Sequence, residues 1–172
     1  MNFIVAPILG AEADHLLVRS DHYMSSLYPA ESNHLVGSES LRSGDALFLG
    51  AFTSHSPPIN SSTLSEDSLE SNSAHCVGCV AARFDRERTY AEIKRLYVDE
   101  DYRGNGLAKT LMVEIESGIL EKGVNCARLE MGIYQPEADA LYRSMGYREI
   151  PPFGDYLLDP LSQFLEKSPL SR

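Results

Sequence analysis

Apolar residues near the middle of the chain follow different patterns on either side of a turn that contains glycine. The segment 90–98 is rich in β-branched and aromatic side chains, which is typical of a strand. After the turn, apolar residues recur at four-residue spacing, at Leu107, Leu111, Ile115 and Ile119. This spacing places them on one face and predicts an amphipathic helix over 106–122. A strand, a tight turn and a helix therefore follow one another directly.

The same patterns divide the rest of the chain into elements. We expect strands at 1–9, 46–53, 76–85, 90–98, 125–133, 147–150 and 162–167, and helices at 11–27, 106–122 and 137–144. Gly123 ends the long helix, as glycine commonly does just past a helix C-terminus. Pro151 and Pro152 end the short strand because proline has no N–H for the ladder. The order is β-α-β-β-β-α-β-α-β-β, and the length of 172 residues suggests one domain, 1–172.

One segment, at about 54–75, breaks this pattern between two predicted strands. It is rich in serine and also holds Pro57, Pro58 and several acidic residues. Such a composition buries too little apolar surface to offset the entropy of ordering it. We therefore expect a mobile, serine-rich insertion that extends a hairpin.

The charge balance narrows the classes of partner. The chain has 15 Lys and Arg against 25 Asp and Glu, which gives a net charge of −10 at pH 7. Clustered Lys and Arg are needed to bind phosphate backbones, so we expect no nucleic-acid partner. No run of about 18 apolar residues is present, so we expect no membrane partner. The composition leaves a homodimer open.

Three cysteines, Cys76, Cys79 and Cys126, form an odd set without a disulfide framework. Such a set is typical of a reducing compartment, and we expect a cytoplasmic protein. Cys76 and Cys79 spell C-x-x-C, but no second close pair completes a zinc site. Residues three apart on a regular strand point to opposite faces. We therefore expect packed thiols and no metal.

The turn itself, from Arg103 to Ala108, reads Arg-Gly-Asn-Gly-Leu-Ala. The N–H groups of a helix's first turn attract anions, and glycine lets the backbone approach them closely. The segment lacks both the Gly-to-Lys spacing of a Walker loop and the third Gly of a Rossmann fingerprint. It resembles the Q/R-x-x-G-x-G/A loop that holds the acyl-CoA pyrophosphate in the GNAT superfamily of N-acetyltransferases.

Two further segments resemble the same superfamily in the same order. Ala91-Glu92-Ile93 precedes the loop with the spacing found in the histone-acetylating branch. The segment 129–147 resembles the strand and helix that carry the signature A-x-x-L-Y-x-x-x-G-F. The closing run 150–156 resembles a small, single-domain branch of bacterial and fungal members. Without this closing run, the three motifs together cover about 91–150.

The resemblance implies a fold and a cofactor. The fold is an α/β (α+β) domain with a mixed, mostly antiparallel sheet of six to seven strands, splayed between strands 4 and 5 and flanked by about four helices. The cofactor is acetyl-CoA, which acts as co-substrate. The resemblance places Leu96, Tyr97 and Val98 beside its pantetheine, Arg103, Gly104, Asn105, Gly106, Leu107, Ala108 and Lys109 around its pyrophosphate, and Gln135 where many members carry an Asn.

Acetyl transfer to an amine also needs a proton acceptor and a proton donor. Glu92 matches the general base of the histone-acetylating branch, and a base is needed because an amine with a pKa near 10 is mostly protonated at neutral pH. Tyr142 matches the tyrosine that protonates the departing thiolate in many members. The structural alternatives are an ion pair of Glu92 with Lys94 or Arg95, and a Tyr142 that only packs.

The superfamily draws its acceptor-binding residues from the first helix, the splayed strands and the final loop. The corresponding candidates are Tyr28, Glu31, Arg95, Glu130, Phe153, Asp155 and Tyr156. Carboxylates in this set favour a cationic amine, whereas Arg95 favours a substrate carboxylate.

We therefore predict an enzyme that moves an acetyl group from acetyl-CoA to a primary amine of a small molecule, by direct attack in a ternary complex. A protein or peptide N-acetyltransferase is the first alternative, and the spacing of Glu92 is its support. A non-catalytic acyl-CoA-binding sensor is the second. A pure binder would need neither Glu92 nor Tyr142, which argues against the sensor.

Overall fold

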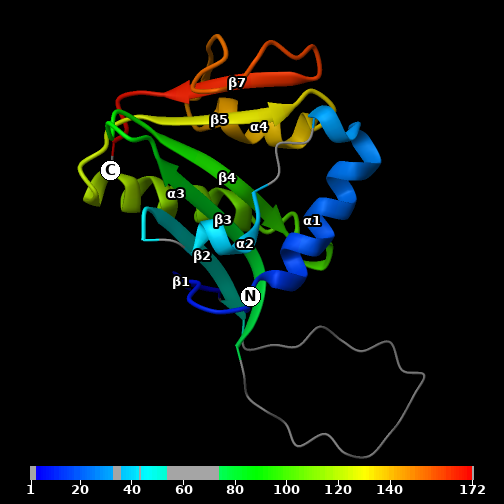
Figure 1. The fold of residues 1–172 in the computed structure, drawn as a ribbon. Helices are drawn as coiled ribbons and strands as arrows, with labels where there is room; N and C mark the ends of the chain where they lie inside the picture. Colours follow the sequence, from blue (N-terminus) through cyan, green and yellow to red (C-terminus); the bar gives the residue numbers. More distant parts are fainter. Residues whose placement is uncertain (1–2, 33–35, 43, 54–73, 172) are drawn as a thin grey trace, which may run out of the picture.

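The fold is a single twisted sheet with helices on both faces, seen in a computed structural model (Figure 1). The structure describes residues 3–32, 36–42, 44–53 and 74–171, so nearly all of the predicted insertion at 54–75 lies outside the described residues. The strands are β1 (Ile4–Pro7), β2 (Ala46–Thr53), β3 (His75–Phe84), β4 (Ala91–Val98), β5 (Ala127–Gly132), β6 (Arg148–Glu149) and β7 (Ser162–Lys167). The helices are α1 (Asp14–Leu27), α2 (Ser38–Leu41), α3 (Leu107–Glu121) and α4 (Pro136–Ser144), with 3-10 turns at Ala30–Ser32 and Glu100–Tyr102.

The predicted element order is confirmed, with ends that differ by a few residues. The additional pieces are α2 and the two 3-10 turns, each only three or four residues long. Segments this short carry no full period of apolar residues, so the pattern could not predict them. No helix of the described part is both long and apolar enough to cross a bilayer.

Strand order explains where a cavity can open. The sheet runs β1-β2-β3-β4-β5-β7-β6, and every neighbouring pair is antiparallel except β4 and β5. The parallel pair is short: it matches Ala91 with Ala127 and Glu92 with Arg128. Beyond these residues the two strands diverge, as Figure 1 shows. The predicted mixed sheet, splayed between strands 4 and 5, is confirmed.

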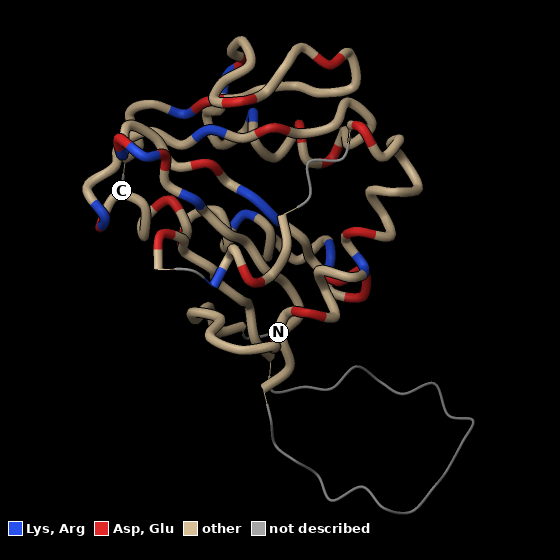
Figure 2. The backbone as a smooth tube through the Cα atoms, in the orientation of Figure 1, with Lys and Arg blue, Asp and Glu red and all other residues tan. Residues whose placement is uncertain are grey.

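The two faces of the sheet hold separate apolar cores. On one face α3 packs against β2, β3 and β4, and the predicted stripe of Leu107, Leu111, Ile115 and Ile119 is buried. On the other face α1 and α2 pack against the same central strands, with Leu16, Leu17 and Leu41 in their core. Acidic and basic positions interleave along the chain (Figure 2), so the net charge of −10 does not come from one acidic block.

One charged residue, Glu116, is buried on the inner face of α3. Its carboxylate accepts a hydrogen bond from the Tyr147 hydroxyl at 2.9 Å and pairs with Lys167 Nζ at 2.6 Å. Desolvation by burial, and then the charge of Glu116, raise the pKa of Tyr147. The middle of α3 is thus fastened both to β7 and to the segment that follows α4.

A β-bulge in β3 overturns one expectation about the C-x-x-C motif. Ala51 pairs with Gly78 and Phe52 pairs with Cys76, so β2 has no partner for Val77. The extra residue changes the alternation, and Cys76 and Cys79 both lie in the core beneath α1. The expectation that these residues point to opposite faces was therefore wrong.

Both thiols of this motif are buried. Desolvation raises the pKa of Cys76 to about 11 and that of Cys79 to about 12. A thiol in this state forms little thiolate at neutral pH and behaves as a small apolar side chain. Both cysteines thus serve as packing residues.

Candidate active site

The glycine loop leads into the first turn of α3, where backbone N–H groups have no acceptor within the helix. Gly104 and Gly106 have φ of 77° and 74°, a left-handed conformation that favours glycine. The Asn105 side-chain amide donates to the carbonyls of Tyr102 and Arg103, each at 3.2 Å, and so holds the turn. The first backbone bond of α3 runs from Thr110 N to Gly106 O at 3.1 Å. The N–H groups of 107–109 therefore have no acceptor within the helix and are available to an anion.

Replacing Gly106 with alanine should weaken acetyl-CoA binding more than it weakens the fold. A left-handed alanine costs roughly 1–2 kcal/mol. The added Cβ meets no protein atom within 4 Å, but Gly106 lines the cavity where a phosphate would lie. We expect the acetyl-CoA Kd to rise at least about tenfold, equivalent to roughly 1.4 kcal/mol, measured by titration calorimetry.

Gly123 offers the matched control for that substitution. It lies just past the other end of α3, has φ of 81°, and also has open space around an added Cβ. Gly123→Ala should lower stability by a similar amount and leave the acetyl-CoA Kd unchanged. Equal losses of affinity in the two variants would mean that strain, and not the phosphate cradle, is responsible.

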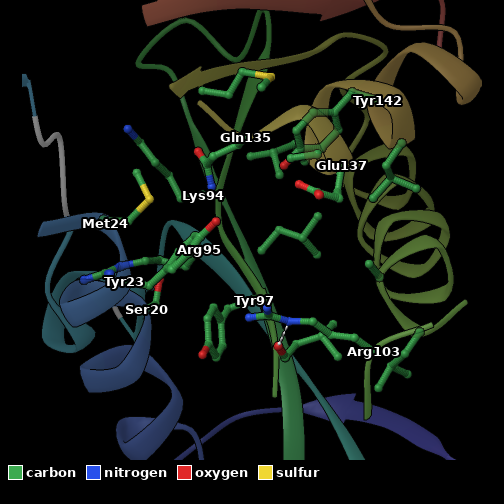
Figure 3. A pocket seen from close by; sticks show the side chains of 18 of the residues that line it. Ser20, Tyr23, Met24, Lys94, Arg95, Tyr97, Arg103, Gln135, Glu137 and Tyr142 are labelled. Atoms are coloured by element: carbon green, nitrogen blue, oxygen red, sulfur yellow. Dashed lines mark hydrogen bonds between the residues drawn. The ribbon is translucent and has the colours of Figure 1, made fainter. Parts of the chain in front are cut away.

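One cavity of about 670 Å³ extends from the glycine loop into the gap between β4 and β5. Its floor is β4 from Ile93 to Val98, and its sides come from α1, α4 and the start of α3. Figure 3 shows Gln135, Glu137 and Tyr142 on the α4 side and Ser20, Tyr23 and Met24 on the α1 side. The divergence of β4 from β5 thus opens a space that reaches both the phosphate cradle and the first helix.

Tyr142, on the inner face of α4, is 7% exposed and lines this cavity. Among the described residues its hydroxyl has no hydrogen-bond partner, and its ring packs on Tyr147 with centroids 5.7 Å apart. Desolvation by burial raises the pKa of Tyr142, and the charge of Glu130 raises it further. The phenol therefore keeps its proton throughout the neutral and mildly alkaline range.

Arg103 folds back over the end of β4. Its Nε donates to the carbonyl of Val98 at 3.0 Å, and its guanidinium lies over the rings of Tyr97 and Tyr23, 5.4 and 6.0 Å from their centroids. Figure 3 shows this contact beside the cavity. The Arg103 guanidinium, which we expect to contact phosphate, thus lies against the edge of β4 that we expect to contact pantetheine.

A β-bulge in β4 sets the direction of Arg95. Cys79 pairs with Tyr97 and Ala81 pairs with Lys94, so two residues of β4 oppose one of β3. Arg95 is left-handed, with φ of 58°, and its nearly buried guanidinium pairs with Asp21 and donates to the Val36 carbonyl at 2.9 Å. Arg95 lines the cavity, but its charge is already matched by α1.

Glu92 is not among the residues that line the cavity. It lies on the part of β4 that is still paired with β5. Its Oε1 accepts a hydrogen bond from the Tyr156 hydroxyl at 2.6 Å and pairs with Lys94 Nζ at 2.8 Å. The ion pair weighed as the structural alternative for Glu92 is therefore present.

The remaining acceptor candidates divide into two groups. Glu130, on β5, lines the cavity and accepts a hydrogen bond from the Ser162 hydroxyl at 2.6 Å. The others, which the cavity lining does not include, are Tyr28, Glu31, Phe153, Asp155 and Tyr156. Tyr28 accepts from the Tyr134 backbone N–H at 2.8 Å, and Phe153 packs edge-on against Tyr156. Glu31 and Asp155 are exposed.

Comparison with known proteins decides the family. Residues 68–149 match the Acetyltransferase (GNAT) domain family. An IAA acetyltransferase from Azospirillum brasilense is 37% identical over 152 residues, which cover 88% of this chain and 87% of that protein. This chain belongs to the GNAT acetyltransferase family. It is therefore an acetyl-CoA N-acetyltransferase enzyme.

Two further proteins are similar to this chain over almost its whole length. An uncharacterized N-acetyltransferase, YsnE, from Bacillus subtilis is 27% identical over 170 residues, 97% of this chain and 99% of that protein. The crystal structure of the PaiA N-acetyltransferase from Thermoplasma acidophilum, in complex with coenzyme A, superposes with a TM-score of 0.66 at 20% identity, covering 98% and 99% of the two chains. At that identity the PaiA structure supports the GNAT fold alone.

GNAT enzymes use acetyl-CoA, and the residues of this site fit such a ligand. The cradle of free N–H groups suits the pyrophosphate, with Arg103 and Lys109 as cations beside it. Leu96, Tyr97 and Val98 line the cavity along β4, where an extended chain can pair with the strand edge. Gln135 lines it at the start of α4.

Some residues that line the cavity of this GNAT enzyme were not predicted from the sequence. They are Ser20, Tyr23 and Met24 of α1, Lys94 of β4 and Glu137 of α4. The spacing of the α1 residues is helical and looks like ordinary packing. Lys94 could have been predicted as a site residue, because it lies two residues after the candidate Glu92 and strand side chains two residues apart share a face.

Proposed function

We propose that this enzyme acetylates a primary amine of a small molecule, with acetyl-CoA as donor, by direct attack in a ternary complex. The observation that carries the proposal is the continuity of the cavity. One space of about 670 Å³ is lined by the glycine loop, by α1, and by Tyr142 and Glu130. Such a volume is typical of a site for small molecules.

The proposed step is a single acyl transfer. The neutral amine nitrogen attacks the thioester carbonyl carbon, and the C–N bond forms as the C–S bond breaks. The nitrogen gives up one proton, and the departing CoA thiolate accepts one. A backbone N–H at the end of β4, from Tyr97 or Val98, is our candidate for stabilising the carbonyl oxygen.

Tyr142 is the proposed donor of the second proton. A phenol with a raised pKa is a weaker acid than free tyrosine, which would oppose the transfer to a thiolate with a pKa of about 8.5 in water. The same burial also disfavours the thiolate anion and so raises the thiol pKa. The two effects offset each other, and the proton transfer remains feasible.

Glu130 is better placed than Glu92 to receive the first proton. Glu130 lines the cavity, and its charge acts on the pKa of Tyr142, so it lies near the reacting end. Glu92 is held away from the cavity lining by Lys94 and Tyr156. We therefore assign Glu130 to the amine, where its charge favours binding of the amine and its carboxylate accepts the proton that the nitrogen gives up on attack.

The proposal predicts both binding and turnover. Acetyl-CoA at 100 times its Kd should raise the unfolding free energy by roughly 2.7 kcal/mol, measured in urea. Incubation with amino acids, polyamines and short peptides should release CoA and yield the N-acetyl product of a small amine in equal amount, measured by mass spectrometry. Stabilisation without turnover would favour the sensor, and turnover of peptides alone would favour the peptide acetyltransferase.

A further inference from the structure

Two residues of opposite charge, Lys94 and Glu130, line the cavity where the sheet opens. The parallel register pairs residue 91 with 127 and residue 92 with 128. Continued by two residues, the same register would set Lys94 of β4 beside Glu130 of β5. The strands have diverged at this point, and Lys94 and Glu130 both line the cavity. A cation and an anion therefore flank the space where an acceptor would lie.

Lys94 is held as a nearly buried ammonium. Its side chain is 11% exposed, Nζ lies 2.8 Å from Glu92 Oε1, and it also donates to the Tyr156 hydroxyl. An ammonium has three N–H donors, and these two contacts use two of them. Within the described part of the chain no further partner takes the third. Tyr156 in turn donates to Glu92 at 2.6 Å, so the three groups fix one another.

Glu130 supplies the opposite charge in the same cavity lining. Its Oε1 accepts from Ser162 at 2.6 Å, which sets the direction of the carboxylate. Its charge contributes, after desolvation by burial, to the raised pKa of Tyr142. It also contributes, after burial and Glu92, to the raised pKa of Tyr156. The charge of Glu130 thus acts on both Tyr142 and the phenol that holds Lys94.

The other cations of the cavity are held at other parts of its lining. Arg95 pairs with Asp21 and with the Val36 carbonyl, and Arg103 lies at the glycine loop against Val98. Lys109 lies in the first turn of α3. Of these cations, Lys94 has the register position beside Glu130, so we take it as the cation that an acceptor between β4 and β5 would meet.

We propose that the acceptor is an amino acid or a similar amine that also carries a carboxylate. Glu130 would bind its ammonium group, and Lys94 would bind its carboxylate by a charge-assisted hydrogen bond. Glu92 and Tyr156 are then positioning residues that hold Lys94. This assignment rests on the proposed acetyl transfer to a small amine. It disfavours polyamines, because their second ammonium would lie against Lys94.

The first test compares each amino acid with its own amide in the wild-type enzyme. The amide keeps the amine and nearly the same volume but removes the negative charge. For a substrate pair such as phenylalanine and phenylalaninamide, extended to leucine and aspartate, we expect kcat/KM to be roughly 10- to 100-fold higher for the acid. Equal or better turnover of the amides across the panel would overturn the carboxylate site and leave the proposed acetyl transfer intact. No turnover of any small amine would overturn the acetyl transfer itself.

Substitution of Lys94 provides the second test. Lys94→Met should lower kcat/KM for the acids roughly 10- to 100-fold, mainly through KM, and change the amide values less than about threefold. The control is Lys122→Met, which removes an exposed lysine at the end of α3 and should change neither value. Equal losses for acids and amides in Lys94→Met would contradict the proposal.

Glu92→Gln separates positioning from base catalysis. The amide can still accept a hydrogen bond, so the fold should tolerate it, but Lys94 loses its counter-ion. If Glu92 positions Lys94, the variant should change KM for acids and leave the amides nearly unaffected. A fall in kcat for acids and amides alike would assign Glu92 to proton removal and contradict its positioning role.

Discussion

Tyr142→Phe is expected to lower kcat by roughly 10²- to 10³-fold, about 3–4 kcal/mol of transition-state stabilisation. The phenol lines the cavity, and among the described residues its hydroxyl bonds to no other group. Phenylalanine preserves the buried ring against Tyr147 and removes only the hydroxyl. The acetyl-CoA Kd should change less than about threefold, since the proton is needed only as the C–S bond breaks. Single-turnover kinetics and calorimetry separate the two effects.

Tyr23→Phe is the matched control, because Tyr23 lines the same cavity from α1. Its kcat should stay within about threefold of wild type. The pH profile gives an independent check: the raised pKa of Tyr142 keeps the phenol protonated, so no fall in kcat up to pH 9 should trace to this group. A kcat for Tyr142→Phe close to wild type would exclude Tyr142 as the proton donor.

Glu116→Ala should cause the largest loss of stability, about 3–5 kcal/mol. The carboxylate is buried between Lys167 and Tyr147, and its removal leaves a nearly buried ammonium and a buried hydroxyl without their partner. The loss should be seen as a lower urea midpoint with an unchanged slope. Since α3 carries the glycine loop at its N-terminus, looser fastening of the helix should also weaken acetyl-CoA binding.

Glu121→Ala is the control on the same helix. Glu121 is exposed, so its removal should alter stability by no more than about 0.5 kcal/mol. A double variant, Glu116→Leu with Lys167→Met, tests the cause of the loss. It should recover much of the stability, because it replaces the ion pair by apolar groups and leaves no unpaired charge. A loss below about 1 kcal/mol for Glu116→Ala would show that the pair is not structurally important.

The helices, the strands and the glycine loop could be predicted from the sequence because each depends on a local pattern of residues. The four-residue spacing of Leu107, Leu111, Ile115 and Ile119 corresponds to a buried helix face. The glycine loop could be predicted because Gly104 and Gly106 lie in the turn between a strand and that helix. In both cases neighbouring residues in the sequence are also neighbours in space.

The two β-bulges could not be predicted from the sequence. Most differences between the predicted and the observed site follow from these bulges or from contacts between distant residues. A bulge depends on the neighbouring strand, so the sequence of β3 alone gives no sign that Cys76 and Cys79 share a face. The network at Glu92 depends on Tyr156, which lies 64 residues away. Its ring is placed by packing against Phe153 and Phe164 in the segment before and within β7. Local patterns cannot supply such contacts.

The divergence of β4 from β5 has a consequence for solubility as well as for binding. Past Glu92, β4 presents a strand edge that β5 does not pair, and such an edge can recruit a strand of another chain. Two features make this edge a poor template: the bulge at Arg95 twists it, and Arg103 occupies the Val98 carbonyl. An acyl-CoA chain lying along the edge would satisfy the remaining groups. Cofactor binding would then also protect the enzyme from aggregation through its own sheet.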